Sequence, residues 1–578
     1  MRFILHYVVK YKMLIVLNLI GVFAFVGIEL GIPTILSKMI DIGITNHDID
    51  YLYRMGFLIL CIALLGGIGN VCITYCSSRI STYITRDIRN DIFKKAQAFS
   101  HIEYNTFGVS SMITRVTNDA FVIMQFVNMV LRIGFITPIM IISSMMMILF
   151  TNIPLSLVIG ACIPIIFLGI CFLVKKSDPL SMKQQKGLDK INRILRENLS
   201  GIRVIRAFRK DVYETNRFQE ANTDFTKYSK KLFKMMSLTH PLFFLLLNFA
   251  MLVIFWMSSH MIDQKALQIG QLVAFVEYMF HAMYSMMLFS TVFVMYPKAA
   301  NSAKRIQELL ASEISITNPE HGVMQGEEES SIQFKNVSFS YPDGEVPVLK
   351  DISFEAKKGQ TVAFIGSTGS GKSTLINLIP RLYDVTSGSI CIDGVDIRQY
   401  DIQALRHKIG FIPQKALLFS GSIQENIQYG KKDAKQEELE HATKTAYAYD
   451  FIMDKPQAFQ SLLAEGGTNV SGGQKQRLSI ARALVRKPEI YIFDDSFSAL
   501  DFKTDAMIRS KLKEETKDSI CLIVAQRISS IQEADMIIVL HEGEMVGKGT
   551  HEELLSSCDI YMEIASSQLT KEELQNEV

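Results

Sequence analysis

Six long apolar stretches constrain the fold of this chain more than any other feature of its sequence. They run approximately over Leu14–Leu36, Met55–Tyr75, Phe126–Phe150, Ile153–Val174, Pro241–Met261 and Ile269–Met295. A helix needs about 20 mostly apolar residues to cross a hydrocarbon core ~30 Å thick, and each stretch is long enough. A chain of 578 residues that is 49% hydrophobic is too long for one domain and too apolar to be simply soluble. The sequence predicts a membrane domain of six transmembrane helices in residues 1–310.

The charges between these stretches predict how the helices are oriented. Residues 175–240 and 79–95 are rich in lysine and arginine, whereas residues 41–50 hold three acids and no lysine or arginine. Only Thr151 and Asn152 separate the third and fourth stretches, which predicts a tight hairpin. Because cytoplasmic loops carry the excess of positive charge, we expect both termini and the two long connections on the cytoplasmic side of the plasma membrane. The first stretch is interpreted as a retained helix, since no small-residue cleavage site follows it.

The remainder of the chain has the pattern of a globular α/β domain. Residues 311–330 are polar, acidic and contain glycine and proline, so we interpret them as a linker. Short β-branched strands then alternate with helical patterns over residues 331–569, and residues 570–578 form a charged tail. The net charge of +2 and the lack of a basic tract give no indication of a nucleic-acid partner.

A glycine-rich segment in this second domain predicts nucleotide binding. Between the strand Thr361–Ile365 and the helix Leu375–Ile379 the chain reads Gly366, Ser367, Thr368, Gly369, Ser370, Gly371, Lys372, Ser373 and Thr374. In this context the backbone N–H groups of a P-loop surround phosphates, the lysine reaches the β- and γ-phosphates, and the following hydroxyl binds Mg²⁺. Asp494 ends the apolar strand Ile490–Phe493, where a carboxylate helps to hold the same ion. The expected cofactors are ATP and Mg²⁺.

A second motif carries a family resemblance. Ser471, Gly472, Gly473 and Gln474, followed by Lys475-Gln476-Arg477, resemble the signature sequence of ABC transporters. The resemblance implies that this segment contacts the γ-phosphate of ATP bound to a partner subunit, across a head-to-tail dimer. It also implies adenine stacking by Tyr341, a Q-loop role for Gln414 as a Mg²⁺ ligand linked to the membrane domain, and a D-loop ending at Asp501. Glu465 precedes the signature as in exporters.

The membrane half extends the resemblance over essentially the whole chain. The segments Gly201–Phe208 and Thr114–Asp119 resemble the cytoplasmic coupling regions of ABC exporters. The implied fold is that of a type IV ABC exporter, with a polytopic α-helical membrane domain fused to an α/β P-loop nucleotide-binding domain. Such a chain is a half-transporter.

Two residues depart from the family pattern. Asp495 stands where the family has a catalytic glutamate, and Gln526 stands where it has a histidine. The aspartate falls short by one C–C bond, roughly 1.5 Å, and loss of a well-placed general base costs about 10²–10⁴-fold in rate. The glutamine can donate a hydrogen bond but cannot carry a positive charge. These departures resemble the degenerate site of heterodimeric ABC multidrug exporters. We therefore expect a weakly hydrolytic ATPase site here and, as partner, a second half-transporter with an intact glutamate and histidine.

Charged residues within the apolar stretches suggest where substrate binds, because such residues are costly in a membrane. Glu277 and His281 are four residues apart and share one face of the sixth helix, Glu29 lies in the first and Arg132 in the third. In exporters the sixth helix lines the central cavity, so Glu277 could attract cationic substrates; the alternatives are that Glu277 is the structural partner of Arg132 or lies near the outer headgroups. The methionines of the sixth helix are interpreted chiefly as packing residues.

The expected function is ATP-driven export of amphipathic drug-like compounds by a heterodimer, with the lipid bilayer and the small-molecule substrate as its other partners. Three alternatives stay open. They are a lipid or peptide exporter with the same machinery, a homodimeric exporter with two slow sites, and an ATP-binding regulator that transports nothing.

Overall fold

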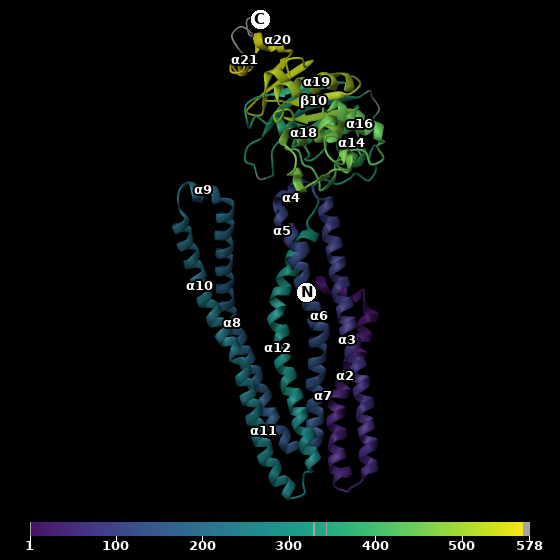
Figure 1. The fold of residues 1–578 in the computed structure, drawn as a ribbon, viewed down its shortest axis with the longest axis vertical. Helices are drawn as coiled ribbons and strands as arrows, with labels where there is room; N and C mark the ends of the chain where they lie inside the picture. Colours follow the sequence, from purple (N-terminus) through teal and green to yellow (C-terminus); the bar gives the residue numbers. More distant parts are fainter. Residues whose placement is uncertain (1, 327–329, 343, 570–578) are drawn as a thin grey trace. The chain divides into compact units, whose positions relative to one another are not determined.

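The computed structural model describes residues 2–326, 330–342 and 344–569, and the predicted tail lies outside the described residues. Its internal contacts divide the chain into two compact units (Figure 1). The membrane unit comprises residues 1–97 and 109–312, and the nucleotide-binding unit comprises residues 98–108 and 313–578. The sequence places residues 98–108 in the first domain, whereas their contacts group them with the second.

The membrane unit is entirely helical in the residues that are described, and Figure 1 shows its long helices running beside one another. Its elements are α1 (Arg2–Val9), α2 (Lys12–Lys38), η1 (Met39–Ile44), α3 (Ile49–Ala98), α5 (Val109–Thr114), η2 (Arg115–Asp119), α6 (Ala120–Met129), η3 (Val130–Gly134), α7 (Phe135–Thr151), α8 (Ile153–Ser200), α9 (Ile202–Ala207), α10 (Asp211–Ser237), α11 (Thr239–Asp263) and α12 (Ile269–Ala311). The elements η1, η2 and η3 are π-helical turns within longer helical runs.

Each predicted apolar stretch lies in a helix. In the described part of the chain, five helical runs are long and apolar enough to cross a membrane. The remaining stretch, 153–174, lies in α8, whose described apolar part is the shorter segment Ile153–Ile166. The predicted hairpin is present: α7 ends at Thr151, and the Asn152 side chain caps α8 by accepting a hydrogen bond of 3.1 Å from the Leu155 N–H.

Helix packing in the membrane unit centres on α12, which lies against α2 and α7. Phe275, Met279 and Met283 of α12 are fully buried there, as the interpretation of these methionines as packing residues requires. Glycines bring α2 and α3 together, because a Cβ atom at Gly21 would lie 3.1 Å from the Gly69 carbonyl oxygen. Small residues allow such close backbone approach in membrane helices.

The nucleotide-binding unit combines strands with shorter helices. Its strands are β1 (Ser331–Phe339), β2 (Leu349–Lys357), β3 (Thr361–Ile365), β4 (Ser387–Ile392), β5 (Val395–Asp396), β6 (Ile409–Ile412), β7 (Gly421–Ser422), β8 (Leu462–Leu463), β9 (Ile490–Asp494), β10 (Ile520–Val524), β11 (Met536–His541) and β12 (Glu544–Gly549). Its helices are α4 (His101–Phe107), α13 (Lys372–Leu378), α14 (Ile402–His407), α15 (Ile423–Gln428), α16 (Gln436–Thr445), α17 (Tyr449–Met453), η4 (Ala458–Gln460), η5 (Glu465–Gly467), α18 (Gly472–Leu484), α19 (Phe502–Glu515), η6 (Ile528–Ser530), α20 (His551–Ser557) and α21 (Asp559–Ser566).

The topology of the larger sheet positions the candidate site. Its strand order is β12-β11-β3-β10-β9-β6, and all neighbours are parallel except the β11–β12 pair. Buried apolar side chains fill both faces of this sheet, as expected for parallel strands covered on two sides. The loops that follow β3, β10, β9 and β6 therefore emerge at one edge, where ligands of open α/β sheets bind. A separate antiparallel sheet has the order β2-β1-β4-β5.

Candidate nucleotide site

The P-loop joins β3 to α13 in the geometry that phosphate binding requires. Gly366 has φ 155°, and a Cβ atom there would lie 2.0 Å from the Leu540 carbonyl oxygen, so only glycine fits. The Lys372 ammonium donates hydrogen bonds of 2.8 Å to the carbonyl oxygens of Gly366 and Ser367, and one of 3.3 Å to Ser370 Oγ. Burial lowers the pKa of Lys372, an effect that the nearby Asp495 and Asp494 carboxylates oppose. The loop thus holds a buried cation at the start of a helix.

Ser373 and Asp494 meet at the end of the sheet. Ser373 Oγ donates a hydrogen bond of 2.9 Å to Asp494 Oδ1 at the last residue of β9. Burial raises the pKa of Asp494, and the hydrogen bond from Ser373 opposes that shift. A hydroxyl and a carboxylate are oxygen ligands of the kind Mg²⁺ prefers when phosphates complete its coordination. The described residues contain no cluster of three or more His, Cys, Asp or Glu side chains placed to hold a metal ion.

Asp495 lies at the centre of a three-residue cluster. Its Oδ2 atom accepts hydrogen bonds from Gln526 Nε2 at 2.9 Å and from Gln414 Nε2 at 3.1 Å. Gln526 follows β10 and Gln414 follows β6, so the parallel strands on both sides of β9 supply the two amides. The Asp495 backbone has φ 45°, a left-handed conformation that aspartate tolerates better than most residues. The cluster therefore holds a carboxylate whose Oδ2 atom already accepts two hydrogen bonds.

Tyr341 lies beside the P-loop. Its hydroxyl is 3.1 Å from Thr374 Oγ1, and its ring packs edge-on against Phe339 and Tyr383 with centroid distances of 4.9 and 5.3 Å. The ring is partly exposed. Its placement next to the loop is compatible with the expected contact to adenine.

The signature residues Ser471–Gln474 form the N-terminus of α18. Ser471 caps α18: its hydroxyl accepts a hydrogen bond from the Gln474 N–H at 3.2 Å, and the Gln474 side chain accepts one from the Ser471 N–H at 3.0 Å. Gly472 is exposed. Among the described residues, no hydrogen bond joins this segment to the P-loop of the same chain. Asp501 similarly caps α19, and the hydrogen bond from Thr504 lowers its pKa.

The candidate substrate residues lie in the membrane unit. Glu29 of α2 and His281 of α12 come within 3.6 Å of each other. Glu277 is exposed on α12, and within the described residues it forms no ion pair with Arg132. Their role in substrate binding stays a prediction.

A short helix that the sequence interpretation missed belongs to the nucleotide-binding unit. In α4, Ser100 and Glu103 form a capping box, and Glu103 Oε1 also accepts a hydrogen bond of 3.0 Å from the Ser315 N–H. His101 packs edge-on against Tyr383, the residue that contacts Tyr341. The spacing Ser-x-x-Glu is a sequence signal for such a helix start.

The two segments expected to be coupling regions are both in the membrane unit. Within it, Asp119 is buried and forms an ion pair with Arg305 and a hydrogen bond of 2.8 Å with Ser302. In contrast, α9 has no buried residue. By contrast, the contacts of α4 group it with the nucleotide-binding unit.

Comparisons with known proteins decide the family. Residues 15–286 match the family model of the ABC transporter transmembrane region, and residues 349–498 match the family model described as ABC transporter. The chain is 36% identical to the uncharacterized ABC transporter ATP-binding protein YfiB of Bacillus subtilis (strain 168), with 98% of each chain covered. This chain belongs to the ABC transporter family.

Two further similarities refine its place among ABC transporters. A Staphylococcus aureus (strain NCTC 8325 / PS 47) ATP-binding/permease protein, assigned to multidrug export by its name alone, is 32% identical over 98% of this chain and 99% of its own length. The structure of a bacterial Atm1-family ABC exporter with ATP bound superposes with a TM-score of 0.80, covering 98% of this chain and 99% of that one at 23% identity. The predicted exporter fold, a helical membrane domain joined to an ABC ATP-binding domain, is confirmed.

Proposed function

We propose that this ABC exporter is one subunit of a heterodimer that moves amphipathic compounds outward across the plasma membrane, and that its own ATP site hydrolyses slowly. The observation that carries the proposal is the cluster at Asp495. One of its carboxylate oxygens accepts two amide hydrogen bonds, and the amides come from Gln414 and Gln526. A general base in ATP hydrolysis must accept a proton from water, and two donors already occupy one of the two oxygens of Asp495 that would accept it.

The length of the Asp495 side chain supports the same conclusion. A glutamate would place its carboxylate roughly 1.5 Å further from the backbone. The left-handed backbone at Asp495 and the hydrogen bond of 2.9 Å from its N–H to the Val524 carbonyl oxygen hold the residue in place, so the backbone is not free to make up that distance. We expect the carboxylate to stand back from the attacking water.

The replacement of a histidine by Gln526 removes a second contribution to the rate of hydrolysis. Its neutral amide cannot stabilise the charge that develops on the γ-phosphate as a protonated histidine would. Gln568 also holds the loop that carries it, donating a hydrogen bond of 2.8 Å to the Gln526 carbonyl oxygen and accepting one of 2.9 Å from the Ile528 N–H. The site keeps the residues that bind nucleotide and lacks those that speed its hydrolysis.

The intact parts of the site define what this chain contributes. Lys372 and the P-loop amides would bind the phosphates, and Ser373, Asp494 and Gln414 would hold Mg²⁺, which neutralises phosphate charge when bound. The exposed Ser471–Gln474 segment is available to a partner's nucleotide. We therefore assign the faster hydrolysis to the partner's P-loop, opposite this signature segment, and a tethering role to the ATP bound here.

ATPase measurements on the purified chain, alone and with the product of a neighbouring half-transporter gene, test the proposal. We expect low activity from the chain alone and high activity from the pair. In the isolated chain, Asp495→Glu combined with Gln526→His should raise the rate by about 10²-fold. The matched control is Asp518→Glu, which lengthens an exposed carboxylate outside the nucleotide site and should give no gain.

The opposite result would support a homodimeric exporter. That candidate rests on one observation, the carboxylate that Asp495 retains beside Asp494 and Lys372. If the chain alone hydrolyses ATP rapidly and Asp495→Ala abolishes that activity, Asp495 is a working base and the heterodimer proposal is wrong.

A further inference from the structure

The membrane unit contains a cavity of about 820 Å³, lined by both polar and apolar side chains, that the nucleotide chemistry does not use. Side chains of α2, α3, α6, η3, α7 and α12 line it, and among them are three amides and one arginine: Asn70, Gln125, Asn128 and Arg132. We propose that this cavity binds the anionic head of an amphipathic substrate through Arg132. The inference rests on the proposed export of amphipathic compounds and names their charge.

Arg132 is a cation without a counter-ion among the described residues. It is exposed to the cavity, and among the described residues it forms no hydrogen bond and no ion pair. The described residues that line the cavity include no aspartate and no glutamate. A lone charge in a membrane helix is costly unless a partner or water compensates it. An anionic ligand is the partner that the lining itself does not supply.

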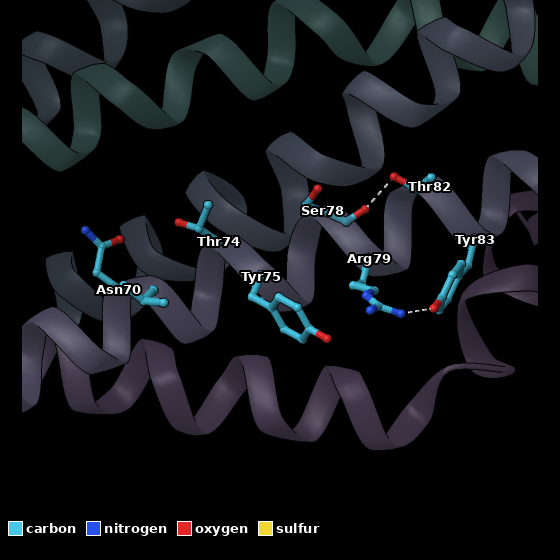
Figure 2. Close-up of a pocket in the computed structure, with 8 residues that line it drawn as sticks. Asn70, Thr74, Tyr75, Ser78, Arg79, Thr82 and Tyr83 are labelled. Atoms are coloured by element: carbon cyan, nitrogen blue, oxygen red, sulfur yellow. Dashed lines mark hydrogen bonds between the residues drawn. The ribbon is translucent and has the colours of Figure 1, made fainter.

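Another arginine of the same unit, Arg79, has protein partners. Figure 2 shows Arg79 on α3 with its guanidinium directed at Tyr83, to whose hydroxyl it donates a hydrogen bond. The guanidinium carbon also lies 5.3 Å from the ring centroid of Tyr75 and 5.5 Å from that of Tyr83. Such cation–π contacts offset part of the loss of hydration. Arg79 has protein partners, whereas Arg132 is left for a ligand.

The position of Arg132 indicates where a substrate would enter. It lies in the π-helical turn η3, six residues after the start of the predicted third span. At 1.5 Å per residue this is about 9 Å inside the cytoplasmic end of that span, by the expected orientation. π-Helical turns inside α-helices occur frequently at functional sites. The cavity is therefore at the depth of the inner leaflet.

A neighbouring cavity of about 370 Å³ suits the apolar part of the same molecule. The two cavities share Met129 and Met295 in their linings, and Met235, Met236 and Lys298 line the smaller one. Methionine side chains adapt to apolar groups of different shape. Lys298 adds a second positive charge, and the described lining again contains no acid. Together the cavities fit an acyl or aryl tail with a carboxylate, sulfonate or phosphate head.

Binding measurements on the full chain in phosphatidylcholine nanodiscs test this inference without ATP or a partner subunit. The probes are 11-(dansylamino)undecanoate, its methyl ester and the corresponding amine, which share a fluorophore and a tail but differ in charge. After subtraction of binding to empty nanodiscs, we expect the carboxylate to bind about tenfold more tightly than the ester, as for a charge-assisted hydrogen bond. Arg132→Gln should remove this difference and Arg132→Lys should keep part of it.

The matched control is Arg54→Gln, which removes a positive charge from an exposed position of α3 outside both cavities. This variant should bind the carboxylate as the unmodified chain does. The inference fails if Arg132→Gln retains the preference for the carboxylate, or if the amine binds most tightly. Because the assay is independent of hydrolysis, its failure leaves the ATPase test of the proposed heterodimer intact.

A second lipid composition distinguishes the two possible sources of the anion, a lipid headgroup and a free amphiphile. One outcome is that, in nanodiscs with one-fifth phosphatidylglycerol, the unmodified chain binds the carboxylate more weakly while the residual binding to Arg132→Gln is unchanged. That result supports the anion site and shows that lipid headgroups occupy it. If phosphatidylglycerol has no effect while the Arg132 dependence persists, the site is supported as one for a free amphiphile.

Discussion

The nucleotide site and the membrane cavity each contain a cation, and the protein treats the two in opposite ways. Lys372 is buried and has three oxygen acceptors from its own loop. Arg132 is exposed in a cavity and has no hydrogen-bond or ion-pair partner in the described part of the chain. The first site is organised before its ligand arrives, whereas we propose that the second leaves its charge to be compensated by its ligand.

This difference matches the demands on the two sites. A nucleotide site binds one ligand in every cycle, so a fixed set of donors lowers the cost of binding. A transport cavity must release its substrate after each passage, and adaptable side chains such as methionine accept several shapes. Preorganisation therefore belongs to the ATP site and adaptability to the cavity.

The largest effect is expected from replacing Lys372 in the preorganised ATP site. Lys372→Ala should weaken ATP binding by about 100-fold, because charge-assisted hydrogen bonds to the phosphates are lost. Fluorescent-nucleotide titration measures the effect. Lys358→Ala, which removes an exposed lysine from the same unit, should bind ATP normally. Equal affinities for both variants would contradict the P-loop assignment.

Glu103 tests whether α4 is bound as firmly to the nucleotide-binding unit as its contacts indicate. Glu103→Ala leaves the Ser100 and Ser315 N–H groups without their acceptor. The loss of one buried partner costs about 1–3 kcal/mol, so amide hydrogen exchange over residues 100–107 should accelerate by about tenfold or more. Glu313→Ala, at an exposed position, is the control. Unchanged protection in α4 would show that these bonds do not hold it.

Asp494 gives a pH-dependent test. Burial raises its pKa, opposed by the hydrogen bond from Ser373. Stability from such a group is fully present below the pKa of the unfolded chain and is lost as pH rises through the folded pKa. Without nucleotide, Asp494→Asn should therefore raise the Tm at pH 8 by about 2 °C, and the gain should disappear as the pH falls below about 4.

In the presence of Mg²⁺ and ATP the same variant should be stabilised less than the unmodified chain, because a metal ligand is lost. Scanning calorimetry at several pH values measures both effects. Asp401→Asn is the matched control: hydrogen bonds from Asn318 and the Ala404 N–H lower the pKa of Asp401, so its replacement should not raise the Tm at any pH. A lower Tm for nucleotide-free Asp494→Asn at pH 8 would contradict the assigned burial penalty.

The smallest expected effect belongs to Arg132. Because no bond to a described residue is lost, Arg132→Gln should lower the unfolding free energy by no more than about 0.5 kcal/mol. Thermal unfolding in nanodiscs measures this, with Arg305→Gln as a contrasting variant that leaves the buried Asp119 without its ion pair. A large loss of stability for Arg132→Gln would show that Arg132 has a structural role, and the comparison with Lys372 would no longer hold.

Much of the fold could be predicted because its signals are local. The apolar stretches, the Asn152 connection and the P-loop are each contiguous in sequence, and a helix or a loop depends mainly on its own residues. The prediction of α4 was equally possible from the spacing of Ser100 and Glu103, but the docking of that helix was not. Its membership in the nucleotide-binding unit depends on Ser315 and Tyr383, which are far away in the chain.

What the sequence by itself determined is the family, the order of the domains and the identity of the two departures, Asp495 and Gln526. The tertiary structure decided that Gln414 and Gln526 meet on one oxygen of Asp495, because parallel strands bring separate loops to one edge of a sheet. It also left Glu277 and Arg132 without a mutual ion pair. In a membrane every face of a helix can be apolar, so hydropathy does not encode how each helix is rotated, and only packing decides which charges meet.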